Sequence, residues 1–521
     1  MVRMRDGVQL ETDVWKPGKG RYPVVLSRGY STEYRDLHKR FTRAGYIYVG
    51  QSARGHGRSE GSLEKDRRFF PDGKDGYDTI EWIVKQPWCD GNVVMYGRSF
   101  WGATQWLAAR EQHPNLRAIL PAAISADFWD CVYRCKGAIT LAMTAHGRAF
   151  TREQGERYGW QRALRYLPLI DLDIAVGGRR DPLWNDYITH SSFDDYWREI
   201  SITDFSRIRI PVFLFAGWND YYPGAAFRDF NNLRQAGTSA EVRILVSNSN
   251  HYGDPDTEFE WAIRWLDSLL RGKDTGIQEE APIQIYVKGV ERWRGEYEWP
   301  LARTKFARYY LRSEDGRRNG RLERSPPDSE APIRYTYDPN DPTPTISGSH
   351  SFLVDIPGLI STGPQDHRPN EGRNDVLVFS TEPLLEDTEI TGPVVMKLYA
   401  ASDALDTDFI VKLLDVHPGG EAMNLSEGIV RARFREDSHG RPRLLEPGKI
   451  YEYTIELLPT ANVFRKGHQI RIHLSSSSWP LWDRNPNTGS PIGMDAEVRI
   501  ANQTVYHDRE RPSHIVLPVI P

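Results

Sequence analysis

The chain has 521 residues, of which 39% are hydrophobic and 26% charged, and its formal net charge is −4. This length predicts roughly two to four domains, and the near-neutral charge argues against a nucleic-acid or anionic-membrane partner. The three cysteines, Cys89, Cys131 and Cys135, form no C-x-x-C pair, which argues against a disulfide framework or a structural zinc site. Because the sequence has neither a signal-peptide pattern nor a run of about 18 apolar residues, we expect a cytoplasmic protein.

The first 125 residues alternate short apolar runs with amphipathic patterns. Such strand–helix alternation predicts a parallel sheet that is covered on both faces. We therefore assign residues 1–125 to the first part of an α/β domain. Strands are expected at 22–29, 45–53, 92–97 and 117–125, and helices at 75–86 and 101–111.

Residues 126–205 break this rhythm. Trp, Arg and Asp recur at helical spacing without a strand signal, which predicts a helical cap inserted into the α/β domain. The α/β pattern returns over residues 206–275, which we assign to the second part of that domain. Strands are expected there at 210–218 and 242–248, and helices at 224–237 and 258–272.

Helical periodicity almost disappears after residue 275. From 280 to 521 short strands follow one another between Gly, Pro and Asp turns, beginning with the run IQIYVKG at 283–289. Many short strands with frequent turn signals are typical of an all-β sandwich or jelly roll. The sequence therefore predicts a C-terminal β-sandwich over residues 280–521.

A serine stands where an expected strand meets an expected helix, in the sequence G-R-S-F-W-G. Gly97 and Gly102 flank Ser99, and the second glycine comes one residue later than in the common G-x-S-x-G pattern. The glycines let the strand and the helix pack closely, and the N–H of Phe100 points to the place where an oxyanion would form. Ser99 is a candidate nucleophile, and the alternative is an ordinary serine in a strand-to-helix turn.

A serine hydroxyl needs a positioned base, and in this type of fold an acid and then a histidine follow the serine along the chain. Asp220 follows the expected strand 210–218 directly, and His251 follows the strand 242–248. Open parallel sheets place their sites at these carboxyl ends of strands. We therefore predict a triad of Ser99, His251 and Asp220.

Other side chains compete for these roles. His56, in a Gly-rich turn, and His190, in the cap, are better explained by local packing. Asp254 lies three residues past His251 and suits a turn amide, whereas Asp75 and Asp78 stand at a helix start, where carboxylates favour free N–H groups.

The loop after the first strong strand of the sheet usually supplies the second oxyanion donor. In this sequence the loop carries Tyr30, whose hydroxyl can take the place of a backbone N–H. Tyr34 is the nearby competitor. Either tyrosine also suits a packed ring with a solvated hydroxyl.

These motifs together resemble the cocaine esterase and X-Pro dipeptidyl-peptidase-like (CocE/NonD) serine hydrolases. The similarity runs nearly end to end, through MRDGVQLETDVWKP, ARGHGRSEG, WCDGNVVMYGRSFWGATQW, AGWNDYY, SNHY and SSSWPLWDRNPNTG. It implies an α/β-hydrolase domain with a helical cap and a C-terminal jelly roll, and no cofactor or metal.

The resemblance also implies roles for individual residues. Ser99 would be the nucleophile, His251 the general base and then acid, and Asp220 the group that orients His251. The oxyanion would lie between the Tyr30 hydroxyl and the Phe100 N–H. Aromatic pocket walls are expected from Tyr133 and Tyr222, and we add Trp101 because it lies two residues after the nucleophile.

The chain departs from the family pattern in three ways. Phe100 replaces the tyrosine that usually follows the nucleophile, and Ser52 replaces the aspartate before the x-R-G-x-G turn. Members that hydrolyse α-amino acid esters hold the ammonium group with carboxylates near the nucleophile, but residues 98 and 100–102 offer none. Recognition of amino esters or X-Pro peptides is therefore unsupported, and only the cap aspartates remain as candidates for it: Asp127, Asp130, Asp194 and Asp195.

We predict a serine hydrolase that cleaves a small-molecule carboxylic ester or amide through an acyl-enzyme. The alternative within enzymes is an X-Pro-type peptidase or a β-lactam or amide acylase with the same triad. The alternative outside enzymes is a binding protein that uses its β-sandwich. Multi-domain, aromatic-rich members of this group often self-associate, so a homo-oligomer is the one protein partner that the resemblance suggests.

Overall fold

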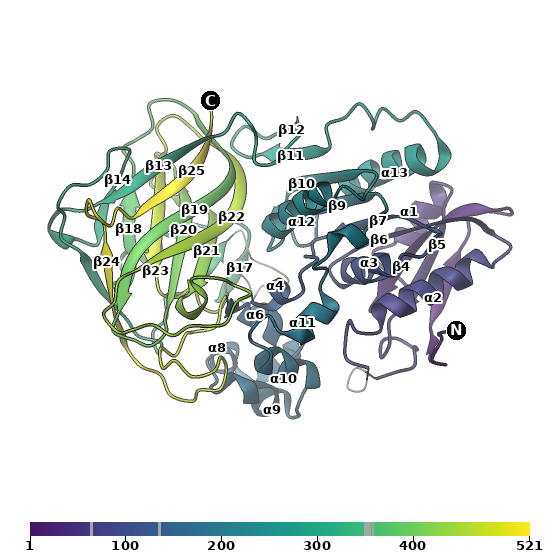
Figure 1. The fold of residues 1–521 in the computed structure, drawn as a ribbon, viewed down its shortest axis with the longest axis horizontal. Helices are drawn as coiled ribbons and strands as arrows, with labels where there is room; N and C mark the ends of the chain where they lie inside the picture. Colours follow the sequence, from purple (N-terminus) through teal and green to yellow (C-terminus); the bar gives the residue numbers. More distant parts are fainter. Residues whose placement is uncertain (63–65, 134–136, 349–355, 357–358) are drawn as a thin grey trace.

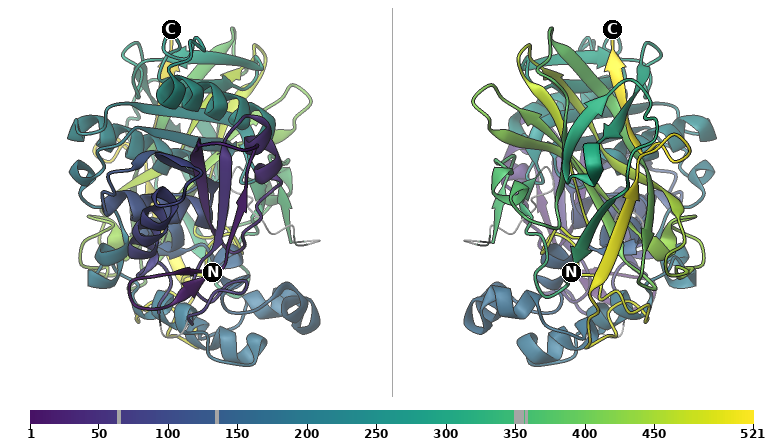
Figure 2. Two further views of the ribbon diagram at one scale, coloured as in Figure 1. Left: turned by 90° about the vertical axis from the view of Figure 1, so that its right-hand side faces the viewer. Right: turned by 90° about the vertical axis from the view of Figure 1, so that its left-hand side faces the viewer.

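The computed structural model describes residues 1–62, 66–133, 137–348, 356 and 359–521. It consists of an α/β part and an all-β part that lie side by side (Figure 1). Seen from opposite ends, the molecule presents the α/β sheet on one side and the long strands of the all-β part on the other (Figure 2). None of the described helices is long and apolar enough to span a bilayer.

A nine-stranded sheet forms the centre of the α/β part, in the order β12-β11-β10-β9-β7-β6-β4-β5-β3. The seven inner strands pair in parallel, whereas β3 and β12 run antiparallel at the two edges. Parallel strands bring their carboxyl ends to one edge, where the site is expected. The strands are β3 (Thr12–Trp15), β4 (Tyr22–Gly29), β5 (Ile47–Ser52), β6 (Cys89–Arg98), β7 (Leu116–Ala122), β9 (Val212–Asn219), β10 (Val242–Asn250), β11 (Ile283–Val287) and β12 (Arg292–Glu296).

Helices cover both faces of this sheet, because successive side chains of a strand point to opposite faces. In β4, Val24 and Leu26 pack in the core beneath α2, α3 and α12, whereas Val25 packs in the core beneath α1 and α13. The prediction of a doubly covered parallel sheet is confirmed. The covering helices are α1 (Leu37–Arg43), α2 (Asp72–Val84), α3 (Phe100–Arg110), α12 (Pro223–Ala236) and α13 (Pro255–Arg271).

The start and end of α13 follow directly from its sequence. The Asp254 side chain accepts a hydrogen bond from the Thr257 N–H at 3.2 Å, and Pro255 occupies the first turn. Gly272 ends the helix with a φ of 62°, which glycine adopts without strain. Asp254 is thus a helix cap, as its position after His251 suggested.

Short helices fill the region between β7 and β9 that was predicted as a cap. They lie along the lower edge of the molecule in Figure 1, between the two parts. Leu141 and Ala142 donate backbone hydrogen bonds to Leu481 and Pro480 of the all-β part, at 2.9 and 3.0 Å. The elements are α4 (Trp129–Val132), β8 (Ala138–Ile139), α6 (Leu141–Ala145), α7 (Arg152–Tyr158), α8 (Trp160–Leu164), α9 (Leu172–Gly177), α10 (Pro182–Thr189) and α11 (Asp195–Ile200).

One expected strand belongs to a different sheet from the one predicted. The run at 283–289 was expected to open the β-sandwich, but β11 pairs in parallel with β10 and β12 pairs with β11, so both extend the α/β sheet. The apolar run has the same appearance in either sheet, so its sequence could not identify the partner. Residues 283–296, which were assigned to the β-sandwich, therefore pair with the α/β sheet.

In the described residues of the all-β part, eleven strands belong to one hydrogen-bonded sheet, and β16 (Ile346–Gly348) and β17 (Ile360–Thr362) pair with each other separately. Its core is a separate cluster of apolar side chains that includes Leu311, Met396 and Ile472. Its longest pairing joins β19 and β22. The strands are β13 (Lys305–Arg312), β14 (Asn319–Glu323), β15 (Ile333–Tyr337), β18 (Leu377–Ser380), β19 (Thr388–Ser402), β20 (Asp408–Val416), β21 (Ala422–Arg431), β22 (Tyr451–Phe464), β23 (Gln469–Ser475), β24 (Ala501–Tyr506) and β25 (His514–Ile520).

Candidate active site

Ser99 lies on the tight turn between β6 and α3. Its backbone has φ 57° and ψ −122°, a conformation that costs a non-glycine residue about 1 to 3 kcal/mol. The turn is held by hydrogen bonds from Ser99 N–H to the Ala122 carbonyl at 2.9 Å and from Ala103 N–H to the Ser99 carbonyl at 2.8 Å. Strain of this kind is typical of a nucleophile presented above the carboxyl edge of a sheet.

The two glycines of the motif make room for α3. A Cβ atom on Gly97 would lie 2.4 Å from the Cβ of Trp101, and one on Gly102 would lie 2.8 Å from Ile124 Cγ2 and 3.1 Å from the Ala122 carbonyl oxygen. Helix α3 therefore approaches the end of β7 more closely than a side chain at 102 allows. The later position of the second glycine reflects this contact.

Asp220 and His251 form a buried hydrogen-bonded pair. The His251 Nδ1 atom lies 3.1 Å from both carboxylate oxygens of Asp220, and both side chains are almost fully buried. Burial lowers the pKa of His251 below 6.5, while the Asp220 carboxylate opposes the shift. Because a carboxylate can only accept, Nδ1 carries the proton and Nε2 carries the lone pair that a general base needs.

A second buried pair holds the loop that carries His251. The Arg98 guanidinium donates to the His251 carbonyl oxygen at 3.0 Å and pairs with the carboxylate of Glu258 in α13. A Cβ atom on Gly253 would collide with both groups, so the loop wraps tightly around them. Arg98, which precedes Ser99 in sequence, thus holds the backbone of His251 and does not line the cavity.

Tyr30 follows β4, and its hydroxyl lies in a cationic environment. The Arg68 guanidinium donates a hydrogen bond to the Tyr30 hydroxyl oxygen and stacks 4.1 Å from the centre of the Phe100 ring. Burial raises the pKa of Tyr30, while Arg148 lowers it, and the hydroxyl stays protonated at neutral pH. Since its oxygen accepts from Arg68, the hydroxyl hydrogen is available to an oxyanion.

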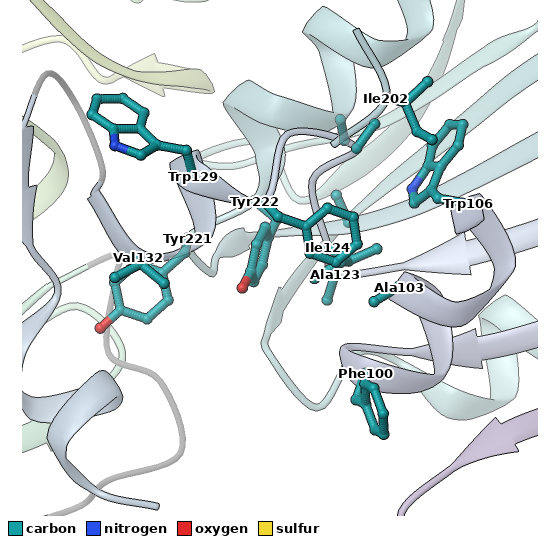
Figure 3. Packing of buried hydrophobic residues seen from close by; sticks show 14 of the residues in the cluster. Phe100, Ala103, Trp106, Ala123, Ile124, Trp129, Val132, Ile202, Tyr221 and Tyr222 are labelled. Carbon is teal, nitrogen blue, oxygen red and sulfur yellow. The ribbon is translucent and has the colours of Figure 1, made fainter. Parts of the chain in front are cut away.

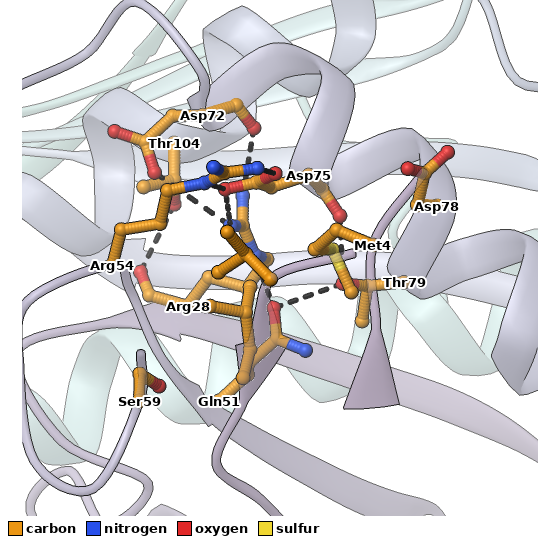
Figure 4. Close-up of polar contacts among 12 residues, drawn as sticks. Met4, Arg28, Gln51, Arg54, Ser59, Asp72, Asp75, Asp78, Thr79 and Thr104 are labelled. Atoms are coloured by element: carbon orange, nitrogen blue, oxygen red, sulfur yellow. Dashed lines mark hydrogen bonds and ion pairs between the residues drawn. The ribbon is translucent and has the colours of Figure 1, made fainter. Parts of the chain in front are cut away.

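A buried polar network fixes the loops on which Tyr30 and Arg68 stand (Figure 4). Arg28, at the end of β4, donates to the Gln51 side chain at 2.6 Å and to the Asp72 carbonyl at 2.8 Å. Arg54 forms a two-pronged ion pair with Asp75 in the first turn of α2, at 2.6 and 2.7 Å. The segment that carries Arg68 is therefore anchored immediately before α2 begins.

A cavity of about 320 Å³ contains Ser99. Apolar groups from α3, from the end of β7 and from the cap form much of its wall (Figure 3). Its lining includes Phe100, Ala103, Ile124, Val132, Met143 and Tyr222, together with Tyr30 and the guanidinium-bearing Arg68 and Arg148.

The predicted pocket residues separate into two groups. Tyr222 lines the cavity, and its ring lies 5.8 Å from that of His251. Trp101 is not among the lining residues, because its ring stacks on Tyr34 at 4.4 Å. Tyr133 is fully buried inside the cap, where its ring stacks on that of Trp129.

The competing residues have structural contacts of their own. His56 packs edge-on against Tyr30, with ring centres 5.0 Å apart, and His190 pairs with Asp194 at 2.6 Å. Tyr34 is engaged with Trp101 and lies outside the cavity lining.

The cap aspartates do not line the Ser99 cavity. Asp127 accepts the backbone N–H of Trp129, Asp130 pairs with Arg228, Asp194 caps α11, and Asp195 pairs with Arg198. Among the described residues, the cavity wall therefore carries arginines but no carboxylate.

Arg68 and Arg148 were not predicted from the sequence as cavity residues. Neither belongs to a motif that we recognised, and they reach the cavity from separate segments of the chain, one before α2 and one in the cap. In the described part of the chain, one group has metal-ligand geometry, namely Asp415, His417 and His468 in the all-β part. It includes no residue of the Ser99 cavity.

Family models match both parts of the chain. Residues 6–253 match the X-Pro dipeptidyl-peptidase (S15 family) model, and residues 275–516 match the X-Pro dipeptidyl-peptidase C-terminal non-catalytic domain. The chain is 34% identical to the cocaine esterase of Rhodococcus sp. (strain MB1 Bresler), over 100% of this chain and 98% of that one. It is 26% identical to a putative serine esterase of Mycobacterium bovis, over 100% and 94% of the two chains.

Solved structures resemble the whole fold. An aminopeptidase from a marine-sediment Thaumarchaeota archaeon superposes with a TM-score of 0.84 at 26% identity, and an α-amino acid ester hydrolase with 0.83 at 26% identity. Each comparison covers 100% of this chain and 95% of the other. The chain therefore belongs to the S15 family of cocaine esterase and X-Pro dipeptidyl-peptidase-like serine hydrolases.

Proposed function

We propose that this chain hydrolyses carboxylic esters through an acyl-enzyme formed on Ser99, with His251 and Asp220 completing the triad. The observation that carries the proposal is the buried His251–Asp220 pair at the carboxyl ends of β9 and β10, beside the strained serine turn at the end of β6. Sequence similarity to a cocaine esterase over the full chain supports an ester as the substrate.

In the proposed acylation step, the Ser99 oxygen attacks the ester carbonyl and its proton passes to His251 Nε2. The carbonyl oxygen becomes an oxyanion between the Tyr30 hydroxyl and the Phe100 N–H. The bond to the leaving alkoxide then breaks as His251 returns the proton to it. Water, deprotonated by His251, attacks the acyl-enzyme and releases the acid and the free Ser99 hydroxyl.

The charges around the cavity favour an ester over an X-Pro peptide. A peptidase that recognises a free amino terminus needs carboxylates to hold the ammonium group. The described wall of the cavity offers Arg68 and Arg148 instead. An amide acylase with the same triad remains the second candidate, which the aminopeptidase-like fold supports.

Labelling with a fluorophosphonate probe tests the nucleophile. We expect a single adduct on Ser99 and none on the Ser99→Ala variant, which should also lose at least ~10³-fold in kcat/KM. A folded wild-type protein that takes no label contradicts the mechanism. Rates on matched 4-nitrophenyl esters and 4-nitroanilides then separate an esterase from an amide acylase.

The oxyanion role of Tyr30 has a matched control in Tyr34, which stacks on Trp101 outside the cavity. We expect Tyr30→Phe to lower kcat by about 10² to 10³-fold, and Tyr34→Phe to leave it unchanged. Equal effects of the two substitutions would contradict the assignment.

We also infer a reducing, cytoplasmic setting, which the low cysteine content of the sequence supports. Self-association of the chain stays a prediction from the family resemblance, and sedimentation velocity measures it.

A further inference from the structure

Two arginines line the cavity with Ser99, the buried Arg68 and the partly buried Arg148, and neither forms an ion pair with a carboxylate of the described residues. Arg68 is only 5% exposed, and its Nε and Nη1 atoms have no hydrogen-bond partner among the described residues. The Arg148 side chain donates to the carbonyl oxygen of its neighbour Gly147 at 3.1 Å and also interacts with the Tyr30 hydroxyl. A buried charge without a counterion is costly, so an arrangement of this kind indicates a missing anion.

Aspartates near these arginines lie outside the Ser99 cavity, and two of them, Asp66 and Asp72, line a smaller cavity together with Arg68. Asp181 interacts with Arg148 at longer range but caps α10 through the Trp184 N–H at 2.9 Å. Asp186 lies 3.8 Å from Arg67. Neither aspartate lines the cavity. In the described part of the wall, the local charge of the cavity is therefore positive.

The cavity lies on the acyl side of the nucleophile. The leaving group must contact His251, because it takes its proton from that residue. His251 does not line this cavity, whereas both oxyanion donors, Tyr30 and Phe100, do. The group that enters the cavity is thus the part of the substrate that stays on Ser99 after the leaving group departs.

We propose that the preferred substrates are esters whose acyl group ends in a carboxylate, that is, half-esters of dicarboxylic acids. The acyl carboxylate would be bound by Arg148, with the buried charge of Arg68 adding to the attraction. The methylene chain of the acyl group would lie along Phe100, Ile124 and Met143. This inference rests on the proposed ester hydrolysis and names its substrate class.

The pocket that we infer is opposite in charge to one that holds an ammonium group. Arg68 would have two roles in this pocket, because the guanidinium that attracts the acyl carboxylate also donates to the Tyr30 hydroxyl. Arg148 also acts on the Tyr30 hydroxyl, so substitution of either arginine would affect every ester through Tyr30. Arg148 is the position for the test because we assign the acyl carboxylate to it, and only the ratio of rates on differently charged esters reports on substrate charge.

The test compares three 4-nitrophenyl esters of similar length, those of hydrogen adipate, methyl adipate and 6-aminohexanoate. For the wild-type protein we expect kcat/KM for the anionic ester to exceed that for the neutral ester by about tenfold or more, with the cationic ester slowest. Arg148→Glu should reverse the order of the anionic and cationic esters. The ratio of rates within one variant is compared, so that a general loss of activity does not mimic the effect.

Arg152→Glu serves as the matched control, because it makes the same change of charge on the exposed face of α7, where Arg152 pairs with Glu156 at 2.9 Å. We expect this control to keep the wild-type ratios. A wild-type protein that hydrolyses the neutral ester at least as well as the anionic one overturns the inference and leaves the proposed function intact. Equal shifts of the ratio in the Arg148 and Arg152 variants also overturn it.

Binding measurements separate this inference from catalysis. By isothermal titration we expect monomethyl adipate to bind the Ser99→Ala protein, and its affinity to fall at least tenfold when Arg148→Glu is added. If no ester is hydrolysed but this binding is seen, the proposed function fails while the anion pocket stands. If the Ser99→Ala protein binds monomethyl adipate no better than methyl butyrate, the pocket assignment is wrong.

Discussion

The buried ion pair between Arg98 and Glu258 offers a way to separate the folding of the site from its activity. Both side chains are only 4% exposed, and Arg98 also holds the His251 carbonyl oxygen. In Arg98→Met the Glu258 carboxylate loses its counterion inside the protein. Removal of one partner of a buried pair typically costs about 3 to 5 kcal/mol. For a domain of this size that corresponds to a fall of roughly 6 to 20 °C in the melting temperature.

The double variant Arg98→Met/Glu258→Leu also removes the Glu258 carboxylate, which has no counterion in the single variant. Apolar replacement of both partners is often neutral or stabilising, so we expect the melting temperature to return close to the wild-type value. We do not expect the activity to return, because the loop that carries His251 has lost its anchor. A displacement of the base by about 1 Å costs on the order of 10²-fold in rate.

The measurements are the melting temperature by calorimetry and kcat/KM on a neutral 4-nitrophenyl ester. Arg264→Met is the matched control, since Arg264 pairs with Glu280 at 3.3 Å on the more exposed surface of the same helix, where such pairs contribute about 0 to 1 kcal/mol. If the double variant regains full activity together with its stability, Arg98 is structural and does not position His251. If Arg98→Met is no less stable than Arg264→Met, the buried-charge reasoning is wrong.

Three further predictions concern the triad and its turn. Ser99→Gly should be inactive yet more stable than Ser99→Ala by about 1 kcal/mol, because glycine adopts the φ of 57° without strain, and a comparison of melting temperatures checks this. Burial lowers the pKa of His251, so the acid limb of the kcat/KM–pH profile should have its midpoint below 6.5. The unfolded chain binds this proton more readily than the folded one, so His251 lowers the stability of the fold as the pH falls through 6.5. A midpoint above 6.5 would contradict this assignment. Gly102→Ala should destabilise the fold by about 1 to 3 kcal/mol, because the added Cβ would lie 2.8 Å from Ile124, whereas Gly372→Ala adds a Cβ with nothing within 4 Å.

The positions of Ser99, Asp220 and His251 at one edge of the sheet were predictable, because each of the three residues has a local signature. Ser99, Asp220 and His251 each follow an apolar strand directly, and parallel strands bring their carboxyl ends to one edge. The doubly covered sheet was predictable for the same reason, since its strands are continuous apolar runs of the kind that a parallel sheet buries.

The walls of the cavity were harder to predict, because they depend on side-chain direction and on distant segments. Trp101 is next in sequence to Phe100, but successive helical residues are rotated by about 100°, so its ring points to Tyr34 while Phe100 and Ala103 line the cavity. Tyr133 supports the interior of the cap. No sequence pattern connects Arg68 with Arg148, because only tertiary packing brings their segments together.

The position of β11 and β12 limits where the chain can be divided into fragments that fold. A fragment that ends within residues 272–282 lacks two strands of its own sheet, and β10 then has a bare hydrogen-bonding edge of the kind that promotes aggregation. The complementary fragment begins with β11 and β12, which pair with each other but have lost the rest of their sheet. The segment is also joined to the all-β part by two backbone hydrogen bonds, from the Lys288 N–H to the Ala461 carbonyl at 3.0 Å and from the Val463 N–H to the Lys288 carbonyl at 2.9 Å. Exchange of the β domain between relatives therefore needs its junction after residue 296, together with a matched contact at Lys288.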